Sequence, residues 1–505
     1  MAHNITGRRL SRRFVLSGVA GVAAWGGLAL LTACGSGTAA TPAVTATAAT
    51  SAVASTGTTP ASSAATSASA ATAASSAETS AASSTAATAS AAPATAGATT
   101  VSYWFWGDAT YLPPEQRVAR AFEQAHPGVH IELSIMAYGD LENKLTATFA
   151  SGAPPDTHHL DMPLVQSYGK RDVLVDLNPF LGRDAVINTA FYQKAAYSKI
   201  ALDIMSYQSH VLGLPNGAAP NLYYYNADMF RAHGLQTPYD LWKADGWTWE
   251  AFADAATHIA KKTGAAWAPA GTDMGLPRLW MNAAGGKEFD DIKAPKQCLY
   301  DDPASLDGLS FLHDLMYKDQ VLPVSFSKEV GTDSTTGFAA GKVAMMARWT
   351  SGILTYNKVT SFKWGMVPYP KRKTYAHDFA TSGDAIAKAS KVQDAAWEWV
   401  KYGVGPEGSA VSAADGTNVY FHPDAQKIAQ QALQKIPSLE TPNAVVEIMA
   451  DGPGSFIRLL SVNQDKINAL ISPDLGKIWS NSMAPADAGK AIAQAVDAFL
   501  QATPQ

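Results

Sequence analysis

The sequence predicts an α/β fold that is divided into more than one compact unit. At 505 residues the chain is longer than a single hydrophobic core usually supports. After a long stretch without aromatic residues, aromatic side chains and regular apolar patterns begin at Val101, and short apolar strands then alternate with amphipathic helices. This alternation is typical of proteins in which helices cover the faces of a largely parallel sheet.

The first elements of this region follow from the spacing of their apolar residues. We expect a strand over 101–106, a helix over 115–125, a strand over 129–135, a helix over 141–149 ended by Gly152, and a strand from near Asp156. The order strand, helix, strand, helix, strand is the βαβ pattern that supports the α/β prediction.

Charge and cysteine content exclude several classes of function. The formal net charge of −5 gives no basic footprint, which argues against nucleic acid as a partner and against a polybasic membrane surface. With only two cysteines, Cys34 and Cys298, the chain can build neither a disulfide framework nor a cysteine zinc site. We expect Cys298 to be a small buried hydrophobe. The expected ligand is a small molecule, and no metal is expected.

The N-terminal segment has the organisation of an export signal. Basic residues at 8–13 precede an uncharged run over 14–33, which ends in Leu31-Thr32-Ala33 before Cys34. The alternative is a permanent transmembrane helix, since about 20 uncharged residues can span a bilayer, but four glycines weaken such a span. The ending resembles the bacterial lipobox, which implies cleavage and a diacylglyceryl anchor on Cys34. Residues 11–16 also resemble a twin-arginine signal, with an ordinary export signal as the alternative.

Residues 34–100 are predicted to be a lipidated cysteine followed by a disordered tether. From residue 35 this segment is almost wholly Ala, Ser and Thr, so it cannot form a core. A flexible coil of this length reaches about 45 Å. The composition also allows an O-glycosylated stalk. The predicted location is therefore extracytoplasmic, with the folded part anchored by lipid to the outer face of the cytoplasmic membrane.

Six short segments, in order along the chain, resemble the extracellular solute-binding proteins of family 1, to which maltose-binding protein belongs. They lie at 122–129, 150–156, 213–226, 247–252, 338–345 and 395–400, and include Ala150-Ser151-Gly152-Ala153-Pro154-Pro155-Asp156 and Phe338-Ala339-Ala340-Gly341-Lys342. The resemblance implies a two-lobed periplasmic-binding-protein fold with hinge strands and a ligand cleft between the lobes. We expect lobe I over 101–217 plus 369–420, lobe II over 220–366 plus 421–505, and hinges at 215–220 and 368–370.

Ligand-binding residues of lobe I are expected after the strands, because ligands of α/β folds lie outside the carboxyl ends of strands. Trp106 could stack on a sugar face and Asp108 could accept hydroxyl hydrogens, although Trp106 could equally be a core residue. Asp161 occupies the equivalent turn after the strand near Asp156, while Asp156 itself is expected to support a turn. Asp384, which follows Ser382-Gly383, is a further candidate.

The remaining candidates rest on the resemblance to the family. Asn221 precedes three tyrosines in the expected hinge strand. In lobe II the segments that line the cleft in the family carry Asp273, Trp280, Arg348 and Trp349. Phe456 is a further candidate, because it follows Gly452-Pro453-Gly454 near an expected third crossing. Arg348 could bind an acidic ligand group or pair with Asp384. The neighbouring residues Trp247 and Trp249 are expected to be structural, with Thr248 capping a helix.

The predicted function is that of a substrate-binding lipoprotein of an ABC importer, which captures a mono- or oligosaccharide and delivers it to permease subunits. No catalytic motif is present: the chain has no G-x-S-x-G, H-E-x-x-H or C-x-x-C pattern. The glycine-containing segments 452–454 and 337–342 match neither a dinucleotide fingerprint nor a phosphate loop, so no cofactor is expected. A surface carbohydrate-active enzyme needs only two carboxylates and stays an alternative, as does a sugar-sensing lipoprotein.

Overall fold

The computed structural model describes residues 87–90, 97–107, 109–194, 196–263, 275–323, 332–451 and 458–503. All of them belong to the second of two separate units, Ala71–Gln505. The predicted export signal, Cys34 and most of the tether lie outside the described residues, as do Asp108, Asp273 and Phe456. No described helix combines the length and the apolar character that crossing a bilayer requires.

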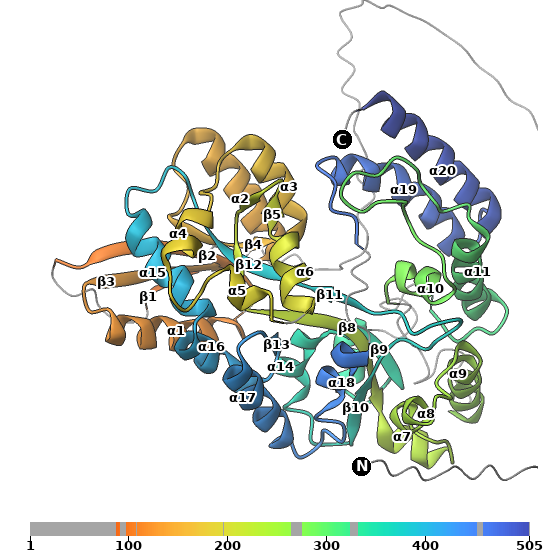
Figure 1. Ribbon diagram of the computed structural model, residues 1–505. Coiled ribbons are helices and arrows are strands. Elements are labelled where there is room, and N and C mark those ends of the chain that lie inside the picture. Colours follow the sequence, from red (N-terminus) through yellow and green to blue (C-terminus); the bar gives the residue numbers. More distant parts are fainter. Residues whose placement is uncertain are drawn as a thin grey trace, which may run out of the picture. The chain divides into compact units, whose positions relative to one another are not determined.

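The first sheet has six strands in the order β1-β3-β2-β4-β12-β7 (Figure 1). Its strands are β1 Ala87–Ser90, β2 Thr99–Trp106, β3 Val129–Met136, β4 Thr157–Asp161, β7 Leu214–Pro215 and β12 Ser382–Ile386. Strand β2 runs parallel to β3 and β4, whereas β12 runs antiparallel to β4 and β7. The predicted strands and the α/β class are therefore confirmed, with antiparallel strands added at both sides.

Helices α1 Leu112–Ala125, α2 Tyr138–Ser151, α3 Met162–Arg171, α15 Gln393–Val404 and α16 Pro406–Ser412 accompany this sheet. Helix α1 begins three residues before the predicted start, because its two prolines occupy the first turn, where a missing N–H costs nothing. Helix α2 ends at Gly152, as predicted, with φ of 75°. Phe105 of β2, Phe122 of α1 and Trp399 of α15 share one buried cluster.

One strand of this sheet lies within the segment expected to be a disordered tether. Ala87–Ser90 pairs with Glu132–Ile135 of β3 in antiparallel register. Backbone hydrogen bonds to an edge strand do not require apolar side chains, so an Ala- and Ser-rich segment can join a sheet edge despite its composition. The lobe boundaries and the rest of the tether stay predictions.

The second sheet is built around one long strand, β8 Gly217–Asn226. Its partners are β9 Met345–Trp349, β10 Trp364–Val367, β11 Asp378–Ala380 and β13 Val419–Tyr420, all antiparallel to β8. Tyr223, Tyr224 and Tyr225 are all buried, because both faces of β8 are covered.

The longer helices of this second part are α9 Trp249–Thr263, α10 Pro277–Ala283, α11 Pro303–Tyr317, α17 Pro423–Gln434, α18 Ala444–Asp451, α19 Gln464–Trp479 and α20 Pro485–Ala502. The short elements of the two parts, in chain order, are α4 Asn178–Arg183, α5 Thr189–Tyr192, α6 Ala196–Ile204, β5 Ser206–Tyr207, β6 His210–Val211, α7 Ala227–Ala232, α8 Pro238–Lys243, α13 Ser334–Ala339, η1 Thr350–Gly352, α14 Ile353–Tyr356 and η2 Ala413–Asp415. Trp247 and Trp249 are fully buried, and Thr248 Oγ1 accepts a hydrogen bond from Ala251 N at the start of α9, as predicted.

Among the described residues, the chain passes directly from a strand of one sheet to a strand of the other at two places, and it reaches the second sheet again through α15 and α16 before β13. The first passage is at Asn216, between β7 and β8, within the predicted hinge; the second is at Thr381, between β11 and β12. The prediction of a passage at 368–370 was wrong. Those residues are fixed within the second part, because Pro368 O accepts a hydrogen bond from Trp247 Nε1 at 2.9 Å and Tyr369 OH donates to Asn221 Oδ1 at 2.8 Å.

Candidate functional site

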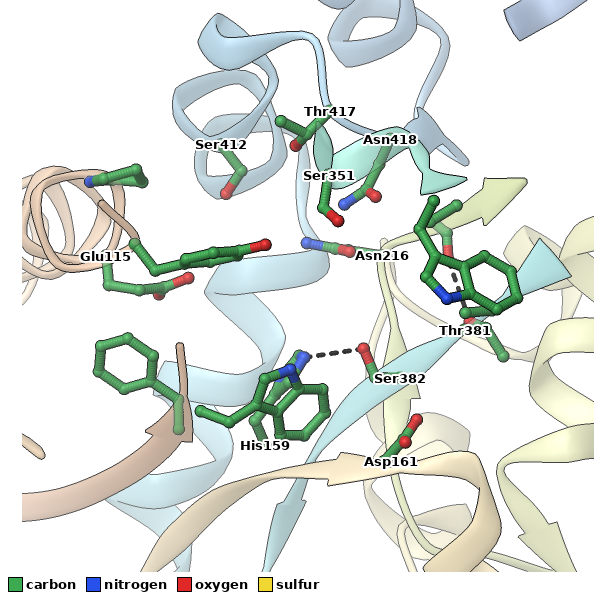
Figure 2. Close-up of a pocket in the computed structure, with 18 of the residues that line it drawn as sticks. Glu115, His159, Asp161, Asn216, Ser351, Thr381, Ser382, Ser412, Thr417 and Asn418 are labelled. Carbon is green, nitrogen blue, oxygen red and sulfur yellow. Dashed lines mark hydrogen bonds between the residues drawn. The ribbon is translucent and has the colours of Figure 1, made fainter. Parts of the chain in front are cut away.

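A cavity of about 440 Å³ lies where the two sheets meet. It is lined by the end of β2, the start of α1, the end of β4, both passages between the sheets, the end of β9 and the segment from α16 to β13. This size falls within the range of ordinary small-molecule sites. Figure 2 shows polar side chains from these separate elements directed toward one common space.

Aromatic side chains form a large part of the wall: Tyr103, Phe105, Trp106, Tyr111, Tyr138, Trp349 and Tyr420. The Trp106 ring lies 4.3 Å from the His159 ring and 5.5 Å from the Tyr138 ring, measured between centroids. The Arg458 guanidinium lies over the Trp349 ring, 5.0 Å from its centroid. Such rings offer flat faces on which the C–H groups of a sugar can stack.

A hydrogen-bonded relay lies behind this wall. His159 Nδ1 contacts Asp384 Oδ1 at 2.9 Å, and His159 Nε2 contacts Ser382 Oγ at 2.7 Å (Figure 2). Tyr103 OH also donates to Asp384 Oδ1, at 2.9 Å. The antiparallel register of β12 on β4 produces this arrangement, because it pairs Asp384 directly with His159.

The relay fixes the hydrogen-bonding role of the imidazole. Because a carboxylate only accepts hydrogen bonds, the neutral His159 ring carries its proton on Nδ1 and its Nε2 accepts from Ser382. Burial by itself lowers the pKa of His159, but the hydrogen bond to Asp384 and the charges of Asp384 and Glu115 outweigh it and raise the pKa above its ordinary value. Asp384 therefore acts on the cavity through His159 and Ser382, since it is not among the lining residues.

Glu115 projects into the cavity from the first turn of α1 (Figure 2). Its carboxyl group has no hydrogen-bond or ion-pair partner among the described side chains. Burial, followed by the charge of Asp384, raises the pKa of Glu115 to about 7. The surroundings of the Glu115 carboxyl group therefore disfavour its charged form.

Asp161 ends β4 and caps α3. Its Oδ1 accepts from Met162 N at 2.9 Å, and its Oδ2 accepts from Tyr138 OH at 2.9 Å. Burial raises the pKa of Asp161, although Arg458 and these hydrogen bonds oppose the rise. The cap explains why this side chain lies at the carboxyl end of the strand, at the edge of the cavity.

Small hydroxyl and amide side chains complete the lining. Figure 2 shows Asn216, Ser351, Thr381, Ser382, Ser412, Thr417 and Asn418 around the cavity. Thr381 donates its own hydrogen to Gly217 O at 3.0 Å, which fixes its orientation. Hydroxyls and amides can both donate and accept hydrogen bonds, as a polyhydroxylated ligand requires.

The structure brings together some of the residues expected from the sequence. Trp106, Asp161 and Trp349 line the cavity, and Asp384 supports it through His159. Asp108, Asp273 and Phe456 lie outside the described residues, so their predicted roles stay predictions.

Besides Asp384, three expected residues are not among those that line the cavity. Trp280 is fully buried in an aromatic cluster, with its ring centroid 5.6 Å from that of Trp249. Asn221 is buried and its Oδ1 accepts from Tyr369. Arg348 donates a hydrogen bond to Thr335 Oγ1. Among the described residues, Asp384 is paired with His159 and not with Arg348.

Sequence reasoning did not identify Glu115, Tyr111, Tyr138, His159, Ser382 or Arg458 as cavity residues. The pair His158-His159 just before Asp161 was a usable signal, because two adjacent residues of a strand face opposite sides. His158 is fully buried, and His159 faces the cavity.

Within the described ranges, no cluster of three or more His, Cys, Asp or Glu side chains could hold a metal ion. Cys298 is buried, as expected, and burial raises the pKa of its thiol to about 12. A thiol in that state is a packing group and a poor nucleophile.

Comparison with known proteins relates this geometry to one family. Residues 108–410 match the model of a family described as bacterial extracellular solute-binding protein. A lactose-binding protein of Rhizobium radiobacter is 25% identical over 312 residues, which cover 60% of this chain and 70% of the relative.

Solved structures show the same fold. An ABC substrate-binding protein from Listeria monocytogenes, in complex with cycloalternan, has a TM-score of 0.68 and 19% identity over 80% of this chain and 99% of its own. The cyclic alpha-maltosyl-1,6-maltose binding protein from Arthrobacter globiformis has a TM-score of 0.65 and 18% identity over 81% of this chain and 100% of its own. The two-lobed fold is thus shared, which places the cavity at the junction of two lobes.

Proposed function

We propose that this chain, which belongs to the family of bacterial extracellular solute-binding proteins, captures a carbohydrate between its two lobes and delivers it to the permease of an ABC importer. The family places the chain outside the cytoplasm and makes it a binding protein rather than an enzyme. The carbohydrate ligand and the attachment to the membrane are parts of this proposal.

The observation that carries the proposal is the composition of the interlobe cavity. Aromatic rings lie beside hydroxyl, amide and carboxylate groups around about 440 Å³ of space. A sugar presents both kinds of surface, C–H faces for the rings and hydroxyls for the polar groups. The lactose-binding relative and the sugar complexes among the structural neighbours support the same ligand class.

A carbohydrate panel tests the proposal directly. The purified chain is screened by thermal shift against mono- and oligosaccharides, and each hit is measured by calorimetry. Trp349→Ala should weaken binding by roughly 1–3 kcal/mol, or about ten- to a hundredfold, because it removes a stacking face. The matched control is Trp249→Ala, which should lower the melting temperature without a selective effect on binding, since Trp249 is fully buried away from the cavity.

Two results would count against this function. One is a panel in which no carbohydrate raises the melting temperature. The other is a sugar whose affinity is unchanged by Trp349→Ala and by Asp108→Ala together, because these side chains are proposed to contact the ligand from the two lobes.

Membrane anchoring through Cys34 is a separate part of the proposal and has its own test. Two acyl chains hold a protein stably on a bilayer, whereas an unacylated chain has no such anchor. Cys34→Ala should therefore be found in the soluble fraction or remain unprocessed. A processed Cys34→Ala chain that still sediments with membranes would show that the anchor lies elsewhere.

A further inference from the structure

The cavity contains carboxylates that form no ion pair with a described residue. Of its lining carboxylates, Asp415 pairs with Arg117 at 2.5 Å. Asp161 accepts hydrogen bonds from Tyr138 and from Met162 N but forms no ion pair with a described residue. Glu115 has neither kind of partner among the described side chains. Among the described residues, two carboxylates thus face the cavity without an ion-pair partner.

The cation on the cavity wall is already engaged. The Arg458 guanidinium stacks on Trp349, and its Nη2 lies 3.9 Å from Asp378 Oδ2. Asp378 is completely buried and also accepts from Arg278 at 2.7 Å. Arg458 is thus held by a buried cluster beneath the wall. Its charge also lowers the pKa of Asp161, but it forms no ion pair with Glu115.

The other groups on the cavity wall near these carboxylates also favour a ligand that donates hydrogen bonds or carries positive charge. While His159 is neutral, its Nε2 takes the hydrogen of Ser382, so Ser382 Oγ offers only lone pairs to the cavity. Tyr103, Phe105, Trp106, Tyr111 and Tyr138 line the same space. The faces of aromatic rings carry negative potential and attract cations.

We propose that the ligand is an amino sugar whose protonated amine lies against Glu115, an inference that rests on the proposed function. An ammonium group supplies the positive charge and the several donors that the carboxylates and Ser382 lack. The hydroxyl and amide groups of Asn216, Thr417 and Asn418 suit the hydroxyls of the same ligand. A simple alkylammonium ion would leave these polar groups unpaired.

The electrostatics of Glu115 agree with this assignment. Its pKa is raised because burial and neighbouring carboxylates disfavour its charge, and the charge of a bound ammonium acts in the opposite direction. A neutral sugar would leave the carboxylate uncompensated. Glu115 is thereby assigned the role of a specificity-determining residue.

Matched ligand pairs test the inference on the purified full chain. Glucosamine, galactosamine and mannosamine, and the disaccharide of glucosamine, are each compared by calorimetry with the neutral sugar that has a hydroxyl in place of the amine and with the N-acetylated form. We expect the amine to bind about ten- to a hundredfold more tightly than its neutral counterparts, because a charge-assisted hydrogen bond is gained.

The variant Glu115→Gln keeps the shape of the side chain and removes its charge. It should abolish most of the preference for the amine over the neutral sugar. The matched control is Glu132→Gln, an exposed carboxylate of β3 that does not line the cavity and should leave the preference unchanged. Asp161→Asn is the second variant; it retains a capping oxygen and should reduce the same preference if Glu115→Gln proves unstable in a melting experiment.

The outcomes separate this inference from the function on which it rests. A neutral sugar that binds as tightly as its amine counterpart overturns the inference and leaves carbohydrate capture intact. An amine preference that survives in both Glu115→Gln and Asp161→Asn overturns the role of the carboxylates. A chain that binds no sugar of either kind overturns the proposed function as well.

Discussion

Glu115 is a cavity residue whose charge lowers the stability of the folded protein. In the ligand-free protein its carboxyl group is desolvated and has no hydrogen-bond or ion-pair partner among the described side chains, so its charge costs free energy at neutral pH. Binding sites commonly retain such groups, because the ligand supplies the missing partner. The side chain that is proposed to determine ligand specificity can therefore also be studied by measuring protein stability.

Glu115→Gln is expected to stabilise the ligand-free protein at neutral and higher pH. The folded pKa of Glu115, about 7, is above the ordinary value of 4.5, so the folded state binds the proton more tightly and the wild type loses stability as pH rises between these values. The gain should be roughly 1–3 kcal/mol above about pH 7 and should vanish below about pH 4. Denaturant melts at several pH values measure it; an equal gain at all pH values would contradict this origin.

His158 presents the opposite case. It is fully buried, neither ring nitrogen has a hydrogen-bond partner among the described residues, and the rings of Phe149 and Tyr168 lie 5.6 and 6.2 Å from it. Burial, with a smaller contribution from the charge of His159, lowers the pKa of His158 to about 3. The imidazole is thus held in its neutral form.

His158→Phe should make the protein more resistant to acid. Because the folded pKa lies below the ordinary value of 6.5, His158 lowers stability progressively as pH falls from about 6.5 toward 3, where the unfolded state takes up the proton first. The variant removes this loss, which amounts to a few kcal/mol near pH 4. Acid unfolding followed by circular dichroism measures the effect. His210→Gln, an exposed histidine, is the control and should leave the acid midpoint in place.

At the scale of elements, the loop before β4 is fixed by one side chain. Asp156 Oδ2 accepts from Ser102 N at 3.0 Å and from Ser102 Oγ at 2.8 Å, and its Oδ1 accepts from Ser390 Oγ at 2.7 Å. These bonds connect β2, the start of β4 and the loop that follows β12. The expected structural role of Asp156 is therefore realised, and it aligns two strands whose ends form the cavity.

Asp156→Ala should cost about 2–4 kcal/mol of unfolding free energy, because several charge-assisted hydrogen bonds are lost and their donors are left partly buried. The control is Asp203→Ala, which removes an exposed ion pair with Lys293 and should cost less than about 1 kcal/mol. Urea unfolding of the two variants compares them. Equal costs would show that Asp156 is no more than a surface carboxylate.

At the scale of the whole molecule, the cavity is shared by two sheets that the chain connects at Asn216 and Thr381. Trp106 comes from the first sheet and Trp349 from the second. Contacts from both sides to one small molecule couple ligand binding to the relative position of the lobes. Short passages between sheets are the places where backbone rotation can change that position.

A saturating sugar should therefore decrease the radius of gyration and change the intrinsic tryptophan fluorescence, because the two lobes approach and the cavity rings lose water. Small-angle scattering with and without ligand measures the first effect. Trp349→Ala should reduce the fluorescence change more than Trp249→Ala does, since only Trp349 lines the cavity. An unaltered radius of gyration at saturation would mean that binding occurs without closure.

Local sequence patterns were enough to predict the α/β class and the first strands and helices, to show the resemblance to the solute-binding family, and to place Trp106, Asp161 and Trp349 at the cavity. Each of these depends on local pattern, because the end of a strand places the following side chain at the edge of a sheet. The contact of His159 with Asp384 and the lack of a partner for Glu115 among the described side chains became known from the three-dimensional structure. The two relay residues are 225 positions apart, and their contact depends on the register of two distant strands. Burial likewise depends on which distant elements cover a residue, a property that local spacing does not contain.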